Sequence, residues 1–181
     1  LLKQIGIRFA VLDIDLDETR LPGEDPETYV RRLALEKARA GHALVAARSD
    51  LPVLAADTAV VVAERILGKP RDRFHAAAMM RLLSGRTHRV LSAVALVGAE
   101  ERRDISISEV RFRAVNAQEA TAYWESGEPR DKAGGYAIQG FGALFVAELR
   151  GSYSGVMGLP LFETARLLAA AGVETGPSRT T

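Results

Sequence analysis

The stretch VLAADTAVVVAE, from Val53 to Glu64, constrains the fold more than any other part of the sequence. It is rich in β-branched residues and almost continuously apolar, which is typical of a strand covered on both faces. Such a strand needs packed elements on each side, which favours an α/β architecture. One carboxylate, Asp57, interrupts the run. Because an ionised carboxylate is costly to bury alone, we expect it to meet a cation, several donors or an open strand end, and we favour a functional role over a structural cap.

Helices and strands alternate along the rest of the chain. Asp25 followed by Pro26 marks a helix start, with the aspartate as cap and the proline in the first turn. Asn116 and Glu119 form a capping-box pattern that opens another helix. Residues 65–72 are interpreted as a turn. We predict helices over 26–45, 73–83, 117–126 and 160–172, and strands over 7–15, 53–64, 87–99, 104–115 and 143–149.

The strand predicted over 104–115 alternates between apolar and polar residues, but with a slip. Ile105 and Ile107 are odd-numbered, whereas Val110 and Phe112 are even-numbered. A β-bulge near Ser108–Glu109 would return all four side chains to one face of the sheet. We therefore expect a bulge at this point.

The length of 181 residues suits one domain with a substantial core. We assign residues 1–172 to a single domain and 173–181 to a polar, disordered tail. The hairpin-like strands over 87–113 favour a mixed, twisted sheet over a purely parallel one. The chain opens at Leu1 without a methionine, so we expect a preceding N-terminal piece.

Composition excludes several classes of function. A net charge of +1 provides no global field for nucleic acid or an anionic membrane. The absence of cysteine excludes disulfides, thiolate metal sites and a cysteine nucleophile, and is compatible with a cytosolic location. No apolar run in the sequence approaches the roughly 20 residues that a membrane-spanning helix needs. The three histidines lack the spacing of a zinc site.

Isolated lysines near carboxylates and glycines are the remaining chemical signal. Lys37 interrupts a face of small and apolar residues, Lys69 lies in the turn GKP, and Lys132 lies in a glycine-rich stretch. The acidic run Asp15–Glu18 could supply oxygen ligands to a hard cation. Each group also has a plain alternative as a solvated surface residue. Together they indicate a small phosphorylated ligand bound with a divalent cation.

Six motifs in order carry a family resemblance: RLALEKARAG, AADT, GKPRD, LSGRTHRV, GEPRDKAGGYAIQGFG and GSYSGVMGLPLFET. From Leu1 to about Gly172 the chain resembles the Maf family of nucleoside triphosphate pyrophosphatases. The form of the fifth motif resembles the branch that acts on dTTP and UTP.

The resemblance implies an elongated α/β fold, related to inosine triphosphatases, with two lobes around a central cleft. It implies hydrolysis between the α and β phosphates to a monophosphate and pyrophosphate, with Mg²⁺ or Mn²⁺, as a house-cleaning activity on surplus or modified pyrimidine nucleotides. A cytoplasmic homodimer is the expected form. The family also begins with a short strand and a Ser-x-Ser-Pro-Arg-Arg segment, and this chain starts just after that point.

The resemblance also assigns roles to individual residues. Asp57 would accept the proton of the attacking water, and Glu18 would join it in holding the metal or the water. Lys37 and Lys69 would hold phosphates. The residues matched to substrate binding are Thr58 and Gln139, which would select the base, and Lys132.

The glycine-rich stretch from Gly127 to Gly142 is then interpreted as a base-recognition loop. Gly127 ends a helix, whereas Gly134, Gly135 and Gly140 would let the backbone approach a nucleotide. The Gln139 amide can both donate to and accept from a pyrimidine edge. For Lys132 and the neighbouring aspartate, a loop-bracing pair remains an alternative to ligand contacts.

Two other functions stay open at this point. One is a non-catalytic nucleotide-binding regulator of cell division, because the family is associated with septum formation. The other is a purine-directed enzyme similar to inosine triphosphatases, which Gln139 in its IQG setting disfavours.

Overall fold

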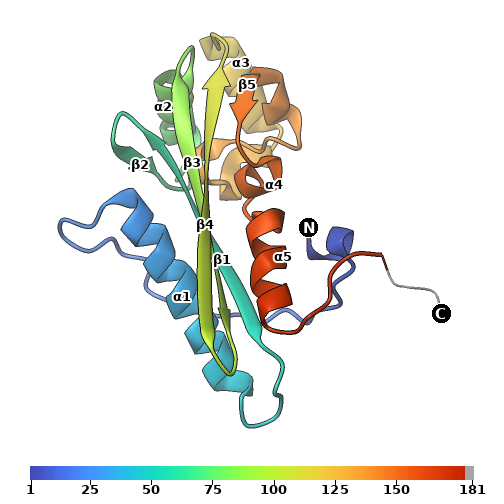
Figure 1. Ribbon diagram of the computed structural model, residues 1–181. Coiled ribbons are helices and arrows are strands. Elements are labelled where there is room, and N and C mark those ends of the chain that lie inside the picture. The colour runs from blue at the N-terminus through green and yellow to red at the C-terminus, as the bar shows by residue number, and fades with distance from the viewer. Residues whose placement is uncertain (178–181) are drawn as a thin grey trace. The chain divides into compact units, whose positions relative to one another are not determined.

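The computed structural model describes residues 1–177 and has an α/β fold (Figure 1). Among these residues, no helix combines the length and apolarity needed to cross a membrane. The helices are α1 (Pro26–Val45), α2 (Arg73–Leu83), α3 (Ala117–Glu125), α4 (Tyr153–Val156) and α5 (Leu161–Ala170), with short 3₁₀ helices at Leu2–Ile5, Glu128–Asp131, Ala133–Gly135 and Phe141–Phe145. The strands are β1 (Val53–Val62), β2 (Arg65–Leu67), β3 (Thr87–Val97), β4 (Glu101–Phe112) and β5 (Val146–Arg150).

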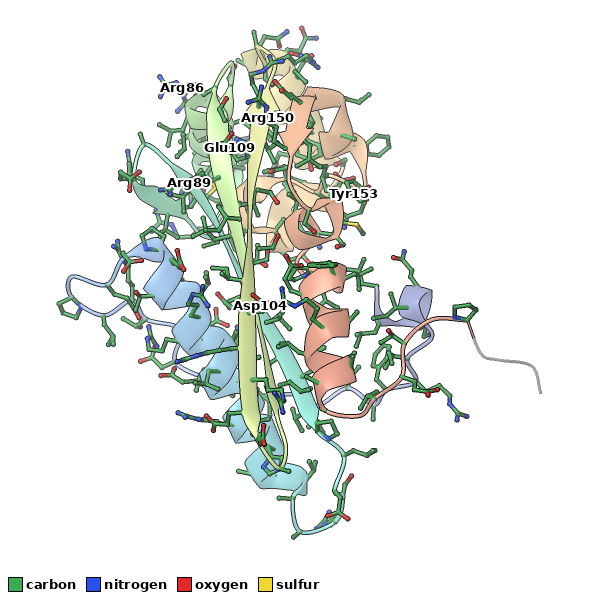
Figure 2. The ribbon with its side chains drawn as sticks, in the orientation of Figure 1. Arg86, Arg89, Asp104, Glu109, Arg150 and Tyr153 are labelled. Carbon is green, nitrogen blue, oxygen red and sulfur yellow. The ribbon has the colours of Figure 1, made fainter. Side chains whose placement is uncertain are left out.

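The strands form one sheet in the order β2-β1-β3-β4-β5. β1 pairs antiparallel with β2, and β4 pairs antiparallel with β5. Glu109 of β4 lies opposite Arg150 of β5, as the two labelled side chains in Figure 2 indicate. β3 and β4 are neighbours joined by residues 98–100, so the hairpin expected in this region is confirmed.

The chain forms two compact units, and β1, β3 and β4 each contribute residues to both. Among the described residues, unit 1 comprises Leu1–Asp57, Ser92–Ser106 and residues 158–177, and unit 2 comprises Thr58–Leu91 and Ile107–Met157. The division falls within β1, between Asp57 and Thr58. The cleft implied by the family resemblance stays a prediction.

Helix α1 presents one buried face to the core of unit 1. The Asp25 side chain accepts hydrogen bonds from the backbone amides of Glu27 and Thr28, and Pro26 occupies the first turn, so the predicted start is confirmed. A methyl group on Gly41 would lie 2.9 Å from Cγ1 of Val53. The small residue therefore lets α1 approach β1 closely.

The other wall of unit 1 is α5. Val94 and Leu96 of β3 pack with Leu167 and Leu168 of α5 in one buried cluster. The intervening residue Ala95 is also fully buried, so this part of β3 is covered on both faces. In Figure 1, α1 and α5 lie on opposite sides of the strands of unit 1.

Unit 2 has a core built from α2, α3 and the adjoining strand segments. Asp72 caps α2 by accepting from the amide of His75 at 2.8 Å, and the predicted capping box of Asn116 and Glu119 opens α3. An aromatic cluster fills the centre. Its rings are those of His88, Phe112, Tyr123, Tyr136 and Phe145.

The strand predicted over residues 7–15 is wrong. No secondary structure is formed there, and Val11 is 83% exposed. Ile7–Ile14 and Pro52–Ala56 line the same groove, about 710 Å³ in volume. A strand needs a hydrogen-bonded neighbour, and no backbone hydrogen bond is described for residues 8–15, so the β-rich composition does not become a strand.

The turn predicted over residues 65–72 is wrong at its start. Arg65–Leu67 forms β2, with Val62 opposite Arg65. The two residues of the connecting turn, Ala63 and Glu64, have φ values of 46° and 60°. Such a turn normally contains asparagine or glycine, so the hairpin carries no recognisable signature in the sequence.

The bulge predicted at Ser108–Glu109 is also wrong, because the register shift between β4 and β5 lies between Arg111 and Phe112. Ser106, Ser108, Val110 and Phe112 are all buried, so even-numbered residues face inward without a break. The buried Ser108 hydroxyl accepts a hydrogen bond from the amide of Ser152 at 2.9 Å, which satisfies it in the core. The two out-of-phase apolar residues, Ile105 and Ile107, therefore lie on the opposite face, where Ile107 is exposed.

The C-terminal part of the chain departs from the sequence predictions in smaller ways. The strand predicted over 143–149 begins at Val146, because Phe141–Phe145 is a 3₁₀ helix. In the tail predicted over 173–181, the amide of Gly176 donates to the carbonyl of Ile5 at 2.9 Å. Residues 178–181 lie outside the described residues.

Candidate active site

Three predicted site residues meet in unit 1 around a single ammonium group. The Lys37 Nζ atom lies 2.8 Å from Oδ1 of Asp57 and 2.5 Å from Oε1 of Glu18. The lysine comes from the middle of α1, the aspartate from β1 and the glutamate from the acidic loop before α1. The lysine that interrupts the small-residue face of α1 is therefore the cation that Asp57 requires.

The three side chains differ in exposure. That of Asp57 is 10% exposed, that of Lys37 22% and that of Glu18 48%. Burial lowers the pKa of Lys37, but hydrogen bonds and charge attraction from both carboxylates outweigh burial and raise it overall. The lysine consequently remains an ammonium ion between its partners.

Tyr29 is a residue of this site that sequence reasoning missed. Its hydroxyl donates to the backbone carbonyl of Glu18 at 2.9 Å. Burial raises the pKa of Tyr29, and the charges of Asp57 and Glu18 raise it further, so the hydroxyl stays protonated. Tyr29 precedes Lys37 by eight residues on α1, but a tyrosine at this spacing breaks no apolar pattern, so the sequence carried no signal for its contact with Glu18.

The loop that carries Glu18 is tied to α1 by a second ion pair. Arg32 donates to both carboxylate oxygens of Glu24 and to the carbonyl of Thr19. The side chain of Glu24 is only 4% exposed, and its Oε2 also accepts from the amide of Leu21. These contacts hold the loop in place, so it is more than a solvated acidic stretch.

Within residues 1–177, no group of three or more His, Asp or Glu side chains is arranged to hold a metal ion. Asp57 and Glu18 supply two carboxylates, and both contact the same lysine. This is too few ligands for a closed protein cage. It suits a cation that draws its remaining ligands from water and a bound phosphate.

Unit 2 holds the other predicted residues. Lys132 Nζ lies 2.9 Å from Oδ2 of Asp131. The hydrogen bond from Lys132 is the main cause of the lowered pKa of Asp131, and the charge of Lys69 also contributes. The carbonyl of Gly68 accepts from the amide of Gly134 at 3.0 Å, so the GKP turn packs on the glycine-rich segment.

The residues predicted to select the base occupy different settings in unit 2. Thr58 directly follows Asp57 in β1 and is partly buried. Gln139 is exposed, in a turn closed by the amide of Gly140 donating to Ala137 at 3.3 Å. No hydrogen bond or ion pair described within residues 1–177 joins Gln139 to the lysines.

Gly134, Gly135 and Gly140 of this loop are explained by packing and backbone conformation inside unit 2. A methyl group on Gly134 would lie 2.9 Å from the Val60 side chain, and one on Gly140 would lie 2.1 Å from Oε2 of Glu128. Gly134 and Gly135 also have φ values of +70° and +69°. Their expected role, an approach of the backbone to a nucleotide, is not needed to account for them.

Comparisons with known proteins agree on one family. The model of the family described as Maf-like protein matches residues 1–171. A relative from Alkalilimnicola ehrlichii is 54% identical over 171 residues, which cover 93% of this chain and 85% of the relative. Relatives from Saccharophagus degradans (52% identical; 94% and 82% covered) and Methylococcus capsulatus (54% identical; 97% and 86% covered) are equally similar. All three are named dTTP/UTP pyrophosphatase.

Proposed function

The chain belongs to the Maf-like protein family, and from this premise we propose that it hydrolyses dTTP and UTP to the monophosphate and pyrophosphate. The observation that carries the proposal is the cluster of Lys37 with Asp57 and Glu18. This cluster supplies a phosphate-binding cation and two carboxylates in a chain 54% identical to a named dTTP/UTP pyrophosphatase.

The charges of the cluster suit attack on a polyphosphate. One ammonium and two carboxylates carry a net charge of −1, which by itself repels a triphosphate. A divalent cation would reverse that sign. Lys69 and Lys132 are further cations for phosphate oxygens. Neutralising the phosphates in this way leaves an oriented water as the remaining requirement for hydrolysis.

Asp57 is the proposed proton acceptor. Its carboxylate is mostly buried but retains 10% exposure, and it is held at a known position by Lys37. An ionised carboxylate so placed can take the proton of a water that attacks phosphorus. Lys37 then binds phosphate oxygen, and Tyr29 holds the backbone that carries Glu18.

Asp57 and Glu18 are the residues that would hold Mg²⁺ or Mn²⁺. Two carboxylates with partial exposure fit a Mg²⁺ ion that keeps several waters and takes substrate phosphates as its other ligands. When bound, the ion would polarise a phosphoryl oxygen and offset developing negative charge. Lys37 would release at least one carboxylate to the ion.

Base selection is assigned to Thr58 and Gln139. An amide side chain can donate to a pyrimidine carbonyl and accept from the ring N–H at the same edge. The exposure of Gln139 supports this assignment, because its amide is accessible to a ligand. A cytoplasmic homodimer acting on surplus or modified pyrimidine nucleotides completes the proposal, and light scattering of the purified protein tests the oligomeric state.

A substrate panel tests the proposed function. The full-length protein would be incubated with Mg²⁺ and dTTP, UTP, ITP, XTP or GTP, and pyrophosphate release would be measured. We expect turnover of dTTP and UTP above the purine nucleotides. A preference for ITP and XTP would favour a purine-directed enzyme, and calorimetric binding without product would favour a non-catalytic regulator.

A further inference from the structure

The buried Tyr123 and the half-buried Glu128 in unit 2 hold both ends of the turn that carries Gln139. Tyr123 of α3 donates its hydroxyl to Oε1 of Glu128 at 2.6 Å. The same hydroxyl accepts from the amide of Ala137, the first residue of the turn, at 3.0 Å. The pair therefore joins α3 to the start of the Gln139 turn.

The carboxylate of Glu128 reaches the other end of the turn. Its Oε2 accepts from the amide of Phe141 at 2.8 Å, and its Oε1 accepts from the amide of Gly142 at 3.0 Å. Gln139 thus lies between two anchored segments of backbone. One anchor is the phenol oxygen of Tyr123 and the other is the carboxylate of Glu128.

The two glycines that follow Gln139, Gly140 and Gly142, leave the space that these anchors occupy. A methyl group on Gly140 would lie 2.1 Å from Oε2 of Glu128. One on Gly142 would lie 2.8 Å from the hydroxyl of Tyr123. Since real Cβ atoms do not approach other heavy atoms so closely, any larger residue would displace an anchor.

Tyr123 is protonated and Glu128 is ionised, as the hydrogen bonds between them require. Tyr123 is only 4% exposed; burial and the neighbouring carboxylate raise its pKa, so it remains a donor. Burial raises the pKa of Glu128, but the hydrogen bonds from Tyr123 and two backbone amides lower it overall. Glu128 is therefore an ionised acceptor that faces three donors. In Glu128→Gln, an amide NH₂ would replace one carboxylate oxygen and would face a donor where Glu128 now accepts a hydrogen bond.

We propose that Glu128 and Tyr123 are positioning residues for base selection, which fix the turn Ala137–Gly140 and thereby the placement of the Gln139 amide. The inference rests on the proposed function and on the assignment of Gln139 to the base. Neither residue is proposed to contact the base. They act through the backbone on each side of Gln139.

The test is a double-mutant cycle with a matched control. Glu128→Gln, Tyr123→Phe and Gln139→Ala would be made singly, and the first two also in the Gln139→Ala background. Glu125→Gln, at the exposed end of α3, controls for the loss of one acidic charge. The readouts are kcat and KM for dTTP, UTP and GTP, together with the thermal unfolding temperature.

We expect Glu128→Gln to lower the ratio of kcat/KM for UTP to kcat/KM for GTP about tenfold or more, because a displaced Gln139 amide would no longer align with the pyrimidine edge. The change should appear in KM for the pyrimidines more than in kcat. In the Gln139→Ala background the same substitution should leave the ratio unchanged, since the group it positions is gone. Glu125→Gln should match wild type.

The outcomes separate this inference from the proposed function. A wild type without turnover of either pyrimidine would overturn both. A selective wild type whose Glu128→Gln and Tyr123→Phe variants keep the same ratio would overturn the inference alone. So would an equal loss of activity on all three nucleotides in both backgrounds, which is the signature of a purely structural role. Tyr123→Phe keeps the ring in the core and provides the test if Glu128→Gln does not fold.

Discussion

His88 is expected to make unit 2 sensitive to mild acid. The residue is only 2% exposed, and its ring packs edge-on against Phe112 and Tyr136, with centroids 5.0 and 5.4 Å away. Its Nε2 atom lies 2.8 Å from the Tyr136 hydroxyl, and its Nδ1 atom has no protein partner among the described residues. Burial lowers the pKa of His88 from 6.5 to about 4. The folded state therefore requires a neutral ring.

The sign and size of the effect follow from linkage. The folded pKa lies below the unfolded value, so the unfolded chain binds the proton more readily between pH 6.5 and about 4. Stability is fully present above pH 6.5 and is lost as the pH falls through this window. From pH 7 to pH 5 the loss from His88 is about 2 kcal/mol in the free energy of unfolding.

The assay is urea unfolding at pH 7 and pH 5, followed by the fluorescence of Trp124, the single tryptophan, which lies in unit 2. The comparison variant is His88→Phe, which keeps an aromatic ring but cannot titrate. Carboxylates contribute equally to both proteins and cancel in the difference. Wild type should lose about 2 kcal/mol more than the variant on acidification. An equal loss in the two proteins would show that His88 is not the source of the acid sensitivity.

Three further predictions concern the loop and the site. Gly134→Ala should destabilise the protein by about 3 kcal/mol, because the residue has a positive φ and its new methyl group would lie 2.9 Å from the core. Gly127→Ala, with a positive φ but open space around it, should cost about 1 kcal/mol. Equal losses of the free energy of unfolding in urea would contradict this. Tyr29→Phe should lower kcat/KM about threefold to tenfold with an unchanged circular dichroism spectrum, and full activity would argue against its support of Glu18. Glu18→Gln should raise the half-saturating Mg²⁺ concentration about tenfold or more, while the control Asp50→Asn, at an exposed carboxylate outside the acidic run, should not. An unshifted Mg²⁺ titration would remove Glu18 from the metal site.

Helix starts were predictable because their chemistry is local. Asp25 and Pro26, and likewise Asn116 and Glu119, act on amides within three residues, so the sequence contains both partners of each contact. The strand predicted over 7–15 failed because a strand depends on a neighbour elsewhere in the chain, and composition does not reveal whether that neighbour pairs.

Some residues of the candidate site were likewise visible in the sequence, and others were not. Asp57 and Lys37 each break an apolar pattern, and such a break is visible without a structure. Tyr29 and Glu128 break no pattern, because a tyrosine on a helix and a glutamate before a proline are ordinary surface residues. Tyr29 contacts a backbone carbonyl 11 positions away in the sequence, and Glu128 contacts backbone amides 13 and 14 positions away. Their proposed roles rest on these contacts, which only the folded chain forms.

The product of dTTP hydrolysis, observed by ³¹P NMR in the presence of Mg²⁺, tests the proposed activity most directly. We expect dTMP and pyrophosphate from the wild type. We also expect a rate at least about 100-fold lower for Asp57→Asn, with the fold retained, because the carboxylate that accepts the proton is gone. Release of orthophosphate with dTDP, or undiminished turnover by Asp57→Asn, would contradict the assignment of Asp57 and its cluster with Lys37 and Glu18 as the active site.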